Sequence, residues 1–147
     1  MLSPVTGVMA HARSEMMNMG MWLAILLGAS LAAVVGFKAL TKRSFLSGRT
    51  PSPLEDIHAL VKEQVSLETL KEVWSVIGKA YSIDPQLIRP TDTFTEFRKI
   101  DSWSLGKGED DIGKWVEQKG LKAPPQLQTV LDFARWVDSS AVVAVSR

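Results

Sequence analysis

The sequence predicts an all-α protein, in which one membrane-spanning helix precedes a small helical bundle. The first observation is a continuous apolar run from Gly20 to Leu40, interrupted only by Lys38. The second is that apolar residues in the later part of the chain recur every three or four positions, the spacing of amphipathic helices. The third is that no pair of alternating segments joined by a hairpin turn is present.

The apolar run GMWLAILLGASLAAVVGFKAL has the length of a membrane span, since a helix over it is about 30 Å long. Basic residues follow it at Lys42, Arg43 and Arg49, whereas its other flank carries little net charge. The positive-inside rule then places residues 41–147 in the cytoplasm, behind a single-pass membrane anchor. A cleaved signal peptide is the main alternative, but the basic segment that should precede it is missing. A buried core helix is the other alternative.

The composition predicts five segments. Residues 1–19 form an N-terminal tail, 20–40 the membrane helix, 41–53 a linker, 54–138 the helical domain and 139–147 an apolar C-terminal tail. The linker mixes bases with Ser, Gly and Pro, which is typical of a flexible tether near an anionic membrane surface. The C-terminal tail has no assigned role; packing on the bundle and contact with a partner both remain open.

Four helices are expected in the domain. Ser52-Pro53-Leu54-Glu55 resembles a capping box that opens a short helix, and Ser66 is the N-cap of a longer one. The longer helix carries an apolar stripe that ends near Tyr81: Leu67, Leu70, Val73, Trp74, Ile77 and Tyr81. A long packed loop is expected over 82–103, a third helix over 109–119 and a last one from about Thr129.

The composition also limits the chemistry. The 147 residues include no cysteine and two histidines, and the net charge is +1. Disulfides and thiolate chemistry are therefore excluded, and a zinc site or a histidine-based triad is disfavoured. No catalytic or metal-binding residue is predicted, and the charge balance gives no reason to expect a nucleic-acid partner. We therefore expect a protein that is not an enzyme.

The stretch DPQLIRPTDTFTEFRKIDSW, residues 84–103, has a distinctive order. After Asp84-Pro85, a proline follows five residues on, Phe94 comes four residues later, and Asp101-Ser102 ends the series after Glu96. This order resembles the acyl carrier protein family, and the last helix TVLDFARWV is similar as well. The resemblance covers residues 66–137, about half of the chain.

The resemblance implies a small acyl-carrier-like bundle with a site at Ser102, next to Asp101. In the family this serine carries 4′-phosphopantetheine, whose thiol holds an acyl group, and the phosphodiester gains from the free amides of a helix N-terminus. The acids of the following helix would steer a basic-surfaced partner enzyme or a phosphopantetheinyl transferase. In this sequence those acids are Glu109, Asp110, Asp111 and Glu117.

Three features depart from the family pattern. Trp103 stands where the family has Leu, the segment from Asp101 to Gly120 is longer, and two glycines, Gly106 and Gly108, interrupt the expected helix. The helix is therefore expected to begin near Gly108, several residues beyond Ser102. Two functions stay open: a membrane-tethered carrier that uses Ser102, or a degenerate carrier fold that acts as a protein-interaction module at the membrane. Trp103 is either a hydrophobic plug of the loop or a partner contact.

Overall fold

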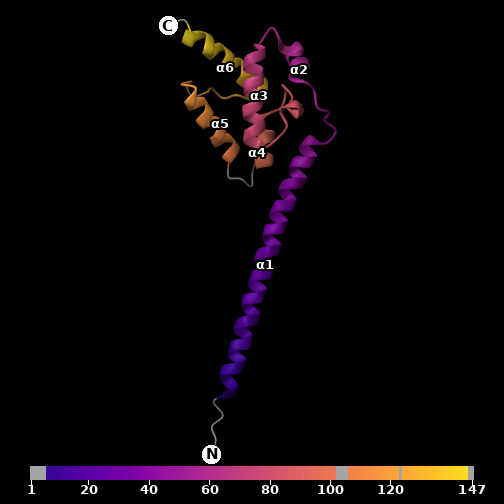
Figure 1. Ribbon diagram of the computed structural model, residues 1–147, viewed down its shortest axis with the longest axis vertical. Coiled ribbons are helices and arrows are strands. Elements are labelled where there is room, and N and C mark those ends of the chain that lie inside the picture. The colour runs from indigo at the N-terminus through magenta and orange to yellow at the C-terminus, as the bar shows by residue number, and fades with distance from the viewer. Residues whose placement is uncertain (1–5, 102–105, 123, 146–147) are drawn as a thin grey trace, which may run out of the picture. The chain divides into compact units, whose positions relative to one another are not determined.

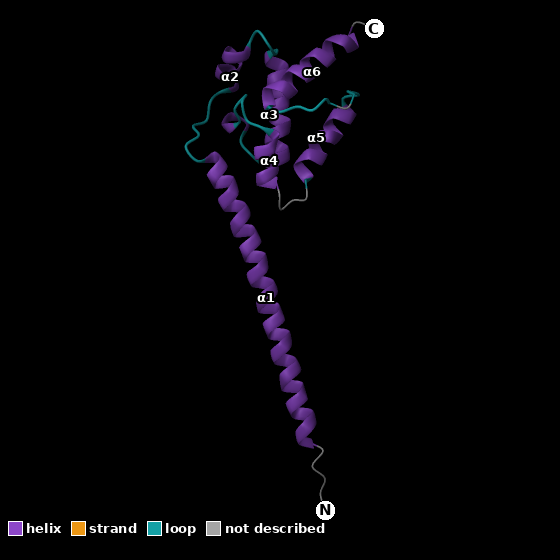
Figure 2. Cartoon of the chain, turned by 180° about the vertical axis from the view of Figure 1, so that it is seen from behind, coloured by secondary structure: helices purple, strands orange, loops and turns teal. Residues whose placement is uncertain are grey.

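The computed structural model describes the backbone of residues 6–101, 106–122 and 124–145, and the side chains of 19–101, 106–122 and 124–141. The chain divides into two units, Met1–Ala39 and Leu40–Arg147. All the elements in the described part are helices, as predicted, and its only β-type pairing is an isolated bridge between Thr93 and Thr129 (Figures 1 and 2).

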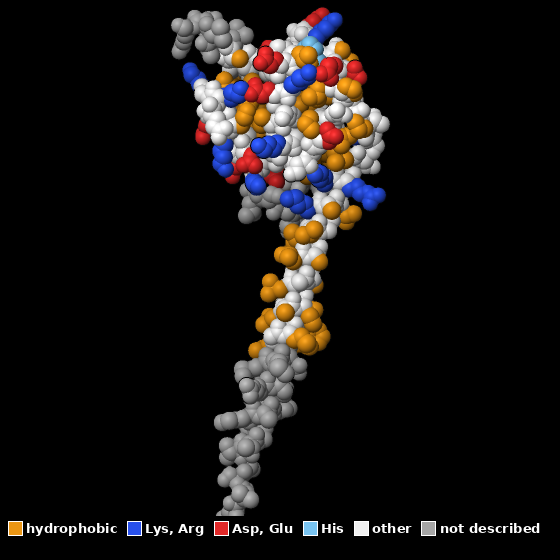
Figure 3. Space-filling model, viewed as in Figure 1, with side chains coloured by type: hydrophobic (Ala, Val, Ile, Leu, Met, Phe, Trp, Pro, Cys, Tyr) orange, Lys and Arg blue, Asp and Glu red, His pale blue; other side chains and the backbone are white. Residues whose placement is uncertain are grey.

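The first helix, α1 (Thr6–Leu46), contains the predicted membrane span. Its segment Met19–Leu46 contains an 18-residue window with a mean hydropathy of 2.1 that the rest of the protein does not bury, so by length and composition it is a candidate to cross a membrane. Hydrophobic side chains cover its described surface (Figure 3). The helix extends beyond the predicted boundaries: it starts within the expected tail and continues through the first six residues of the expected linker, 41–46.

The second unit is built around α3. Its elements are α2 (Leu54–Val61), α3 (Leu67–Tyr81), η1 (Pro85–Leu87), α4 (Phe94–Asp101), α5 (Lys107–Gln118) and α6 (Val130–Val145). Helix α3 packs against α2, α4, α5 and α6. Its predicted apolar stripe faces the core from Leu70 to Tyr81, and Trp74 is fully buried and donates its indole N–H to the carbonyl of Ile88 at 3.1 Å.

The prediction of a loop over residues 82–103 is wrong in one respect, because this segment contains the helix α4. The first turn of α4 is closed by a capping box: the Thr93 amide donates to Glu96 at 2.9 Å, and the Glu96 amide donates to the Thr93 hydroxyl at 3.3 Å. Phe97 and Ile100 then face the core. The helix is short and its apolar positions are few, so periodicity alone did not reveal it.

Helix α6 begins with the same local pattern. The Thr129 amide donates to Asp132 at 3.1 Å, and the Asp132 amide donates to the Thr129 hydroxyl at 3.2 Å. The helix then continues to Val145, through most of the predicted tail 139–147. The hydroxyls of Ser139 and Ser140 donate to the carbonyl of Trp136, which lets two polar residues lie inside a helix.

Candidate functional site

The predicted site residues lie at the junction of α4 and α5. Ser102 and Trp103 are outside the described residues. Asp101 is the last residue of α4, whereas Glu109, Asp110, Asp111 and Glu117 all belong to α5. The helix begins at Lys107, close to the predicted start, so its first residue is five positions beyond Ser102.

Asp101 is buried, with 8% of its surface exposed, and it caps α5. Its Oδ2 accepts a hydrogen bond from the amide of Gly108 at 2.8 Å. The residue at the start of α5, Gly106, has a left-handed conformation with φ 79° and no side chain that could cap the helix. The carboxylate of Asp101 therefore satisfies one of the amides that a helix N-terminus leaves without a partner.

Gly108 has a packing role. A Cβ placed on it would lie 2.5 Å from Cε1 of Tyr81, so only glycine allows α5 to approach α3 this closely. The Tyr81 ring stacks in turn on Phe97, with 4.8 Å between ring centroids. The Tyr81 hydroxyl is buried and has no hydrogen-bond partner among the described residues. Burial, reinforced by the charges of Glu109 and Asp101, raises the pKa of Tyr81.

The expected acidic face of α5 is partly neutralised. Glu109 forms an ion pair with Arg98 of α4, and this contact raises the pKa of Arg98. Asp111 lies 3.9 Å from Nζ of Lys114. The remaining two acids, Asp110 and Glu117, are exposed. Because 110 and 117 are two helical turns apart, these two acids lie on the same side of α5.

A pocket of about 590 Å³ opens between α4, α5, residues 124–128 and the start of α6. Its apolar lining includes Phe94, Ile112, Val116 and Phe133, and its polar lining includes Thr95, Arg98 and Glu109. Gly113 forms part of the wall, and a Cβ added there would meet no atom within 4 Å. Sequence reasoning missed this pocket because its walls come from four segments; the one local sign was a glycine inside a helix.

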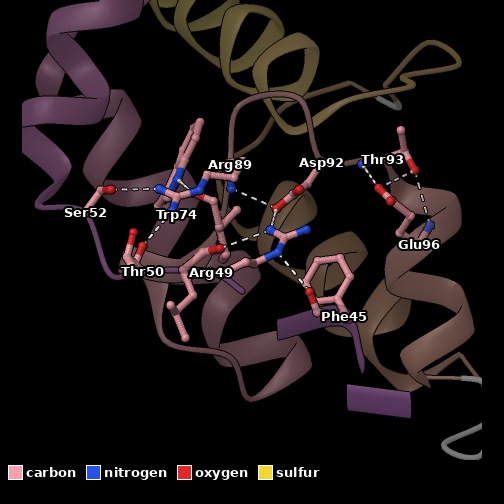
Figure 4. Close-up of polar contacts among 11 residues, drawn as sticks. Phe45, Arg49, Thr50, Ser52, Trp74, Arg89, Asp92, Thr93 and Glu96 are labelled. Atoms are coloured by element: carbon pink, nitrogen blue, oxygen red, sulfur yellow. Dashed lines mark hydrogen bonds and ion pairs between the residues drawn. The ribbon is translucent and has the colours of Figure 1, made fainter. Parts of the chain in front are cut away.

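A polar cluster lies elsewhere, around Arg49 and Asp92 (Figure 4). Arg49 Nη1 is 2.6 Å from Oδ2 of Asp92, a carboxylate whose side chain is 5% exposed. Arg49 also donates to the carbonyls of Leu87 at 3.1 Å and Phe45 at 2.9 Å, and its guanidinium lies 3.9 Å from the centroid of the Phe45 ring. The amide of Arg89 donates to the same carboxylate oxygen at 2.7 Å.

A second arginine joins the same two segments. The guanidinium of Arg89 donates to the Ser52 hydroxyl at 2.8 Å and to the Thr50 carbonyl at 2.6 Å, and the Ser52 amide donates to the carbonyl of Gln86 at 2.9 Å. The expected tether 41–53 is therefore helical up to Leu46 and bonded to the fold from Phe45 to Ser52. Arg49 was counted among the flanking bases, yet its charge pairs with Asp92, 43 residues away.

No family model, no curated protein and no solved structure matches this chain. Within the part of the chain that the structure describes, no group of three or more potential ligand side chains could hold a metal ion.

Proposed function

We propose that this protein is a membrane-anchored binding module: an acyl-carrier-like helical unit that binds a partner protein and does not use a phosphopantetheine arm. The observation that carries this proposal is the position of Asp101. Its buried carboxylate already accepts from the first turn of α5, where the carrier family binds the phosphodiester of its prosthetic group.

The described residues at this helix end do not fit 4′-phosphopantetheine on Ser102. The Gly108 amide that a phosphodiester would use at this helix start already donates to the carboxylate of Asp101. The phosphodiester would also have to reach a helix whose first residue lies five positions further along the chain. The family resemblance therefore supports the type of fold more strongly than it supports the modification.

The pocket beside α5 suits a protein partner. Its apolar lining can accept a hydrophobic side chain, and the exposed Asp110 and Glu117 lie on α5 three residues before and four residues after Gly113. A partner segment that combines an apolar side chain with flanking Lys or Arg residues would complement both features. The charges would mainly steer the encounter, while burial in the pocket would supply affinity.

Anchoring follows from α1. Its segment Met19–Leu46 supplies the apolar length of a membrane span, and Lys42 and Arg43 follow the most apolar part. By the positive-inside rule these bases favour a cytoplasmic helical unit. The binding module would then act on partners at the inner membrane surface.

Intact mass tests the absence of the arm. The full chain is co-expressed with a broad-specificity phosphopantetheinyl transferase, purified in detergent and weighed, with a known carrier protein as the positive control. We expect the unmodified mass. A pantetheine adduct that disappears in Ser102→Ala would overturn the proposal and establish the second candidate, a carrier whose acyl chain the same pocket has the volume to receive.

Site-specific crosslinking tests the binding surface. A photo-reactive amino acid replaces Thr95, which is exposed at the pocket, or Lys62 on the far side of α3 as the control. We expect a protein adduct from position 95, which Gly113→Leu reduces by filling the pocket and Gly113→Ala leaves intact. Equal adducts from positions 95 and 62, or adducts insensitive to Gly113→Leu, would contradict pocket binding.

A further inference from the structure

Basic side chains gather at one end of the second unit. This end, called here the basic end, is formed by the C-terminal turns of α1, α3 and α4 and by the first turn of α5. Its bases are Lys42, Arg43, Lys79, Arg98, Lys99 and Lys107. Figure 3 shows many Lys and Arg side chains along the lower part of this unit.

Side-chain contacts bring these four elements together. Lys42 donates to the carbonyl of Ser82, the residue that ends α3. The Phe45 ring packs on Phe97 of α4, with 5.4 Å between centroids. Gly108 at the start of α5 abuts Tyr81 of α3, and Arg98 pairs with Glu109. The bases therefore belong to one surface although they lie up to 65 positions apart in the sequence.

The acids at this end offset the bases only in part. Asp101 is buried, Glu109 is paired with Arg98, Glu96 of α4 interacts with Lys99, and the exposed Asp84 and Asp110 remain. At the other end, where α2 joins α3, acids exceed bases: Glu55, Asp56, Glu63 and Glu68 accompany Lys62 and Lys71. Positive charge is therefore concentrated near the C-terminal end of α3, and negative charge near its N-terminal end.

Helix dipoles explain some of these bases but not all. Arg43, Lys79, Arg98 and Lys99 lie in last turns, where a cation complements the negative end of the macrodipole. Lys107 is the first residue of α5, where the dipole disfavours a cation. The carboxylates of Asp101, Glu109 and Asp110 lie at the same helix start and offset this local cost, so Lys107 is a base that the helix dipole does not explain.

We propose that the basic end binds the anionic head groups of the lipid bilayer that α1 enters. This inference rests on the proposed anchoring of α1, but not on the pocket or on Ser102. Lys42 and Arg43 follow the end of the apolar run by two and three residues, so the chain delivers this end to the membrane surface. Bases within a Debye length of an anionic leaflet are attracted to it.

The absence of cysteine allows a direct test, since a single label can be placed anywhere. The full chain carries a fluorophore at Ser82→Cys on the basic end, or at the exposed Gln64→Cys on the opposite end. It is reconstituted into nanodiscs of phosphatidylcholine alone or with a third of phosphatidylglycerol, each with a head-group quencher. We expect more quenching at position 82 in anionic than in neutral discs, with the excess suppressed by 0.5 M salt, and little quenching at position 64.

A charge reversal at Lys107 tests whether the bases of the basic end bind the lipid head groups. Lys107→Glu should weaken docking about fivefold or more, because a base near an anionic surface contributes roughly that factor. It places an acid at a helix N-terminus, which favours α5, so unfolding would not explain the loss. Lys62→Glu, the same change at the opposite end, should have no effect. Equal quenching in neutral and anionic discs, or no response to Lys107→Glu, would overturn the inference.

The outcome is separable from that of the proposed function. A chain that fails to co-elute with discs would overturn both the anchoring and this inference. A chain that co-elutes without quenching at position 82 would overturn lipid docking alone, while the mass and crosslinking results would stand.

Discussion

Two buried carboxylates bracket α4, and they are held in different ways. Asp92, just before the helix, pairs with the guanidinium of Arg49 and accepts a second bond from the Arg89 amide. Asp101, at its end, accepts one bond from the amide of Gly108. The first contact joins segments 43 residues apart, whereas the second spans seven.

This difference in contacts assigns a structural role to Asp92 and places Asp101 at a candidate binding site. The Asp92 region is closed: its carboxylate is nearly buried and is bound by Arg49 and by the amide of Arg89, and the Phe45 ring covers the guanidinium of Arg49. The Asp101 region caps α5 through the Gly108 amide, near the pocket and at the basic end. Asp92 should therefore matter for stability alone, while changes around Asp101 should alter both stability and binding.

The largest effect is expected for Arg49→Ala. It removes the cation and leaves Asp92 buried without a charged partner, which costs about 3–5 kcal/mol of the free energy of unfolding. Urea denaturation of the full chain in detergent, followed by tryptophan fluorescence, measures this loss, and the buried Trp74 is one of the five reporters.

A double-mutant cycle with Asp92→Ala supplies the control, because the double variant should be less destabilised than the sum of the two singles. Lys71→Ala removes a cation from the exposed pair with Glu55 and should cost far less stability than Arg49→Ala, because solvent screens the pair. Similar losses for Arg49→Ala and Lys71→Ala would contradict the closed character of the Asp92 region.

Two glycines of α5 should respond in opposite directions. Gly108→Ala forces a Cβ to within 2.5 Å of the Tyr81 ring and should destabilise the unit by about 1–3 kcal/mol. Gly113→Ala meets open space inside the same helix and should stabilise it by up to about 1 kcal/mol. Thermal unfolding of both variants decides the point: destabilisation by both would show that α5 does not approach α3 as described.

The capping bond of Asp101 is tested by a pair of substitutions. Asp101→Ala leaves the Gly108 amide without an acceptor and should cost about 1–3 kcal/mol. Asp101→Asn keeps an acceptor oxygen and should cost less. If the two variants lost the same stability, the contribution of Asp101 would come from its charge rather than from capping.

A third carboxylate, that of Asp138, extends the comparison of Asp92 and Asp101 to a side chain that is only half-buried. It accepts from the hydroxyls of Ser66 and Thr69, both at 2.7 Å, at the start of α3. Asp138→Ala should cost about 1 kcal/mol, the usual effect of losing an N-cap contact.

The same residue gives a pH dependence. Burial alone would raise the pKa of Asp138, but hydrogen bonds from Thr69 and Ser66 outweigh it, and the pKa is lowered. A lowered pKa means that the stabilisation is complete above the unfolded value of about 3.8 and is lost as the pH falls below it. The wild type should lose stability through this range more steeply than Asp138→Asn; parallel curves would contradict the assignment.

Local patterns predicted much of this fold. The apolar stripe of α3 and the acids of α5 placed two helices well, and both glycines were recognised as obstacles to an early start of α5. The short helix α4 was missed although its Thr93-x-x-Glu96 pattern was present. The Arg49–Asp92 pair and the pocket could not be predicted, because each depends on contacts between segments far apart in the sequence. The packing role of Gly108 could not be predicted either, because it depends on a contact with Tyr81 of another helix.

The smallest effect, and the most informative about the Asp101 region, is expected for Tyr81→Phe. The hydroxyl is buried without a partner among the described residues, so its removal should be neutral or should stabilise the unit by up to about 1 kcal/mol. Since burial raises the pKa of Tyr81, the wild type should also lose stability as the pH rises above about 10, and the Phe variant should lose less. Urea denaturation at pH 8 and pH 10.5 measures both. A loss of more than about 1 kcal/mol at pH 8 would show that the hydroxyl is bonded in the native protein, and would make the Asp101 region as closed as that of Asp92.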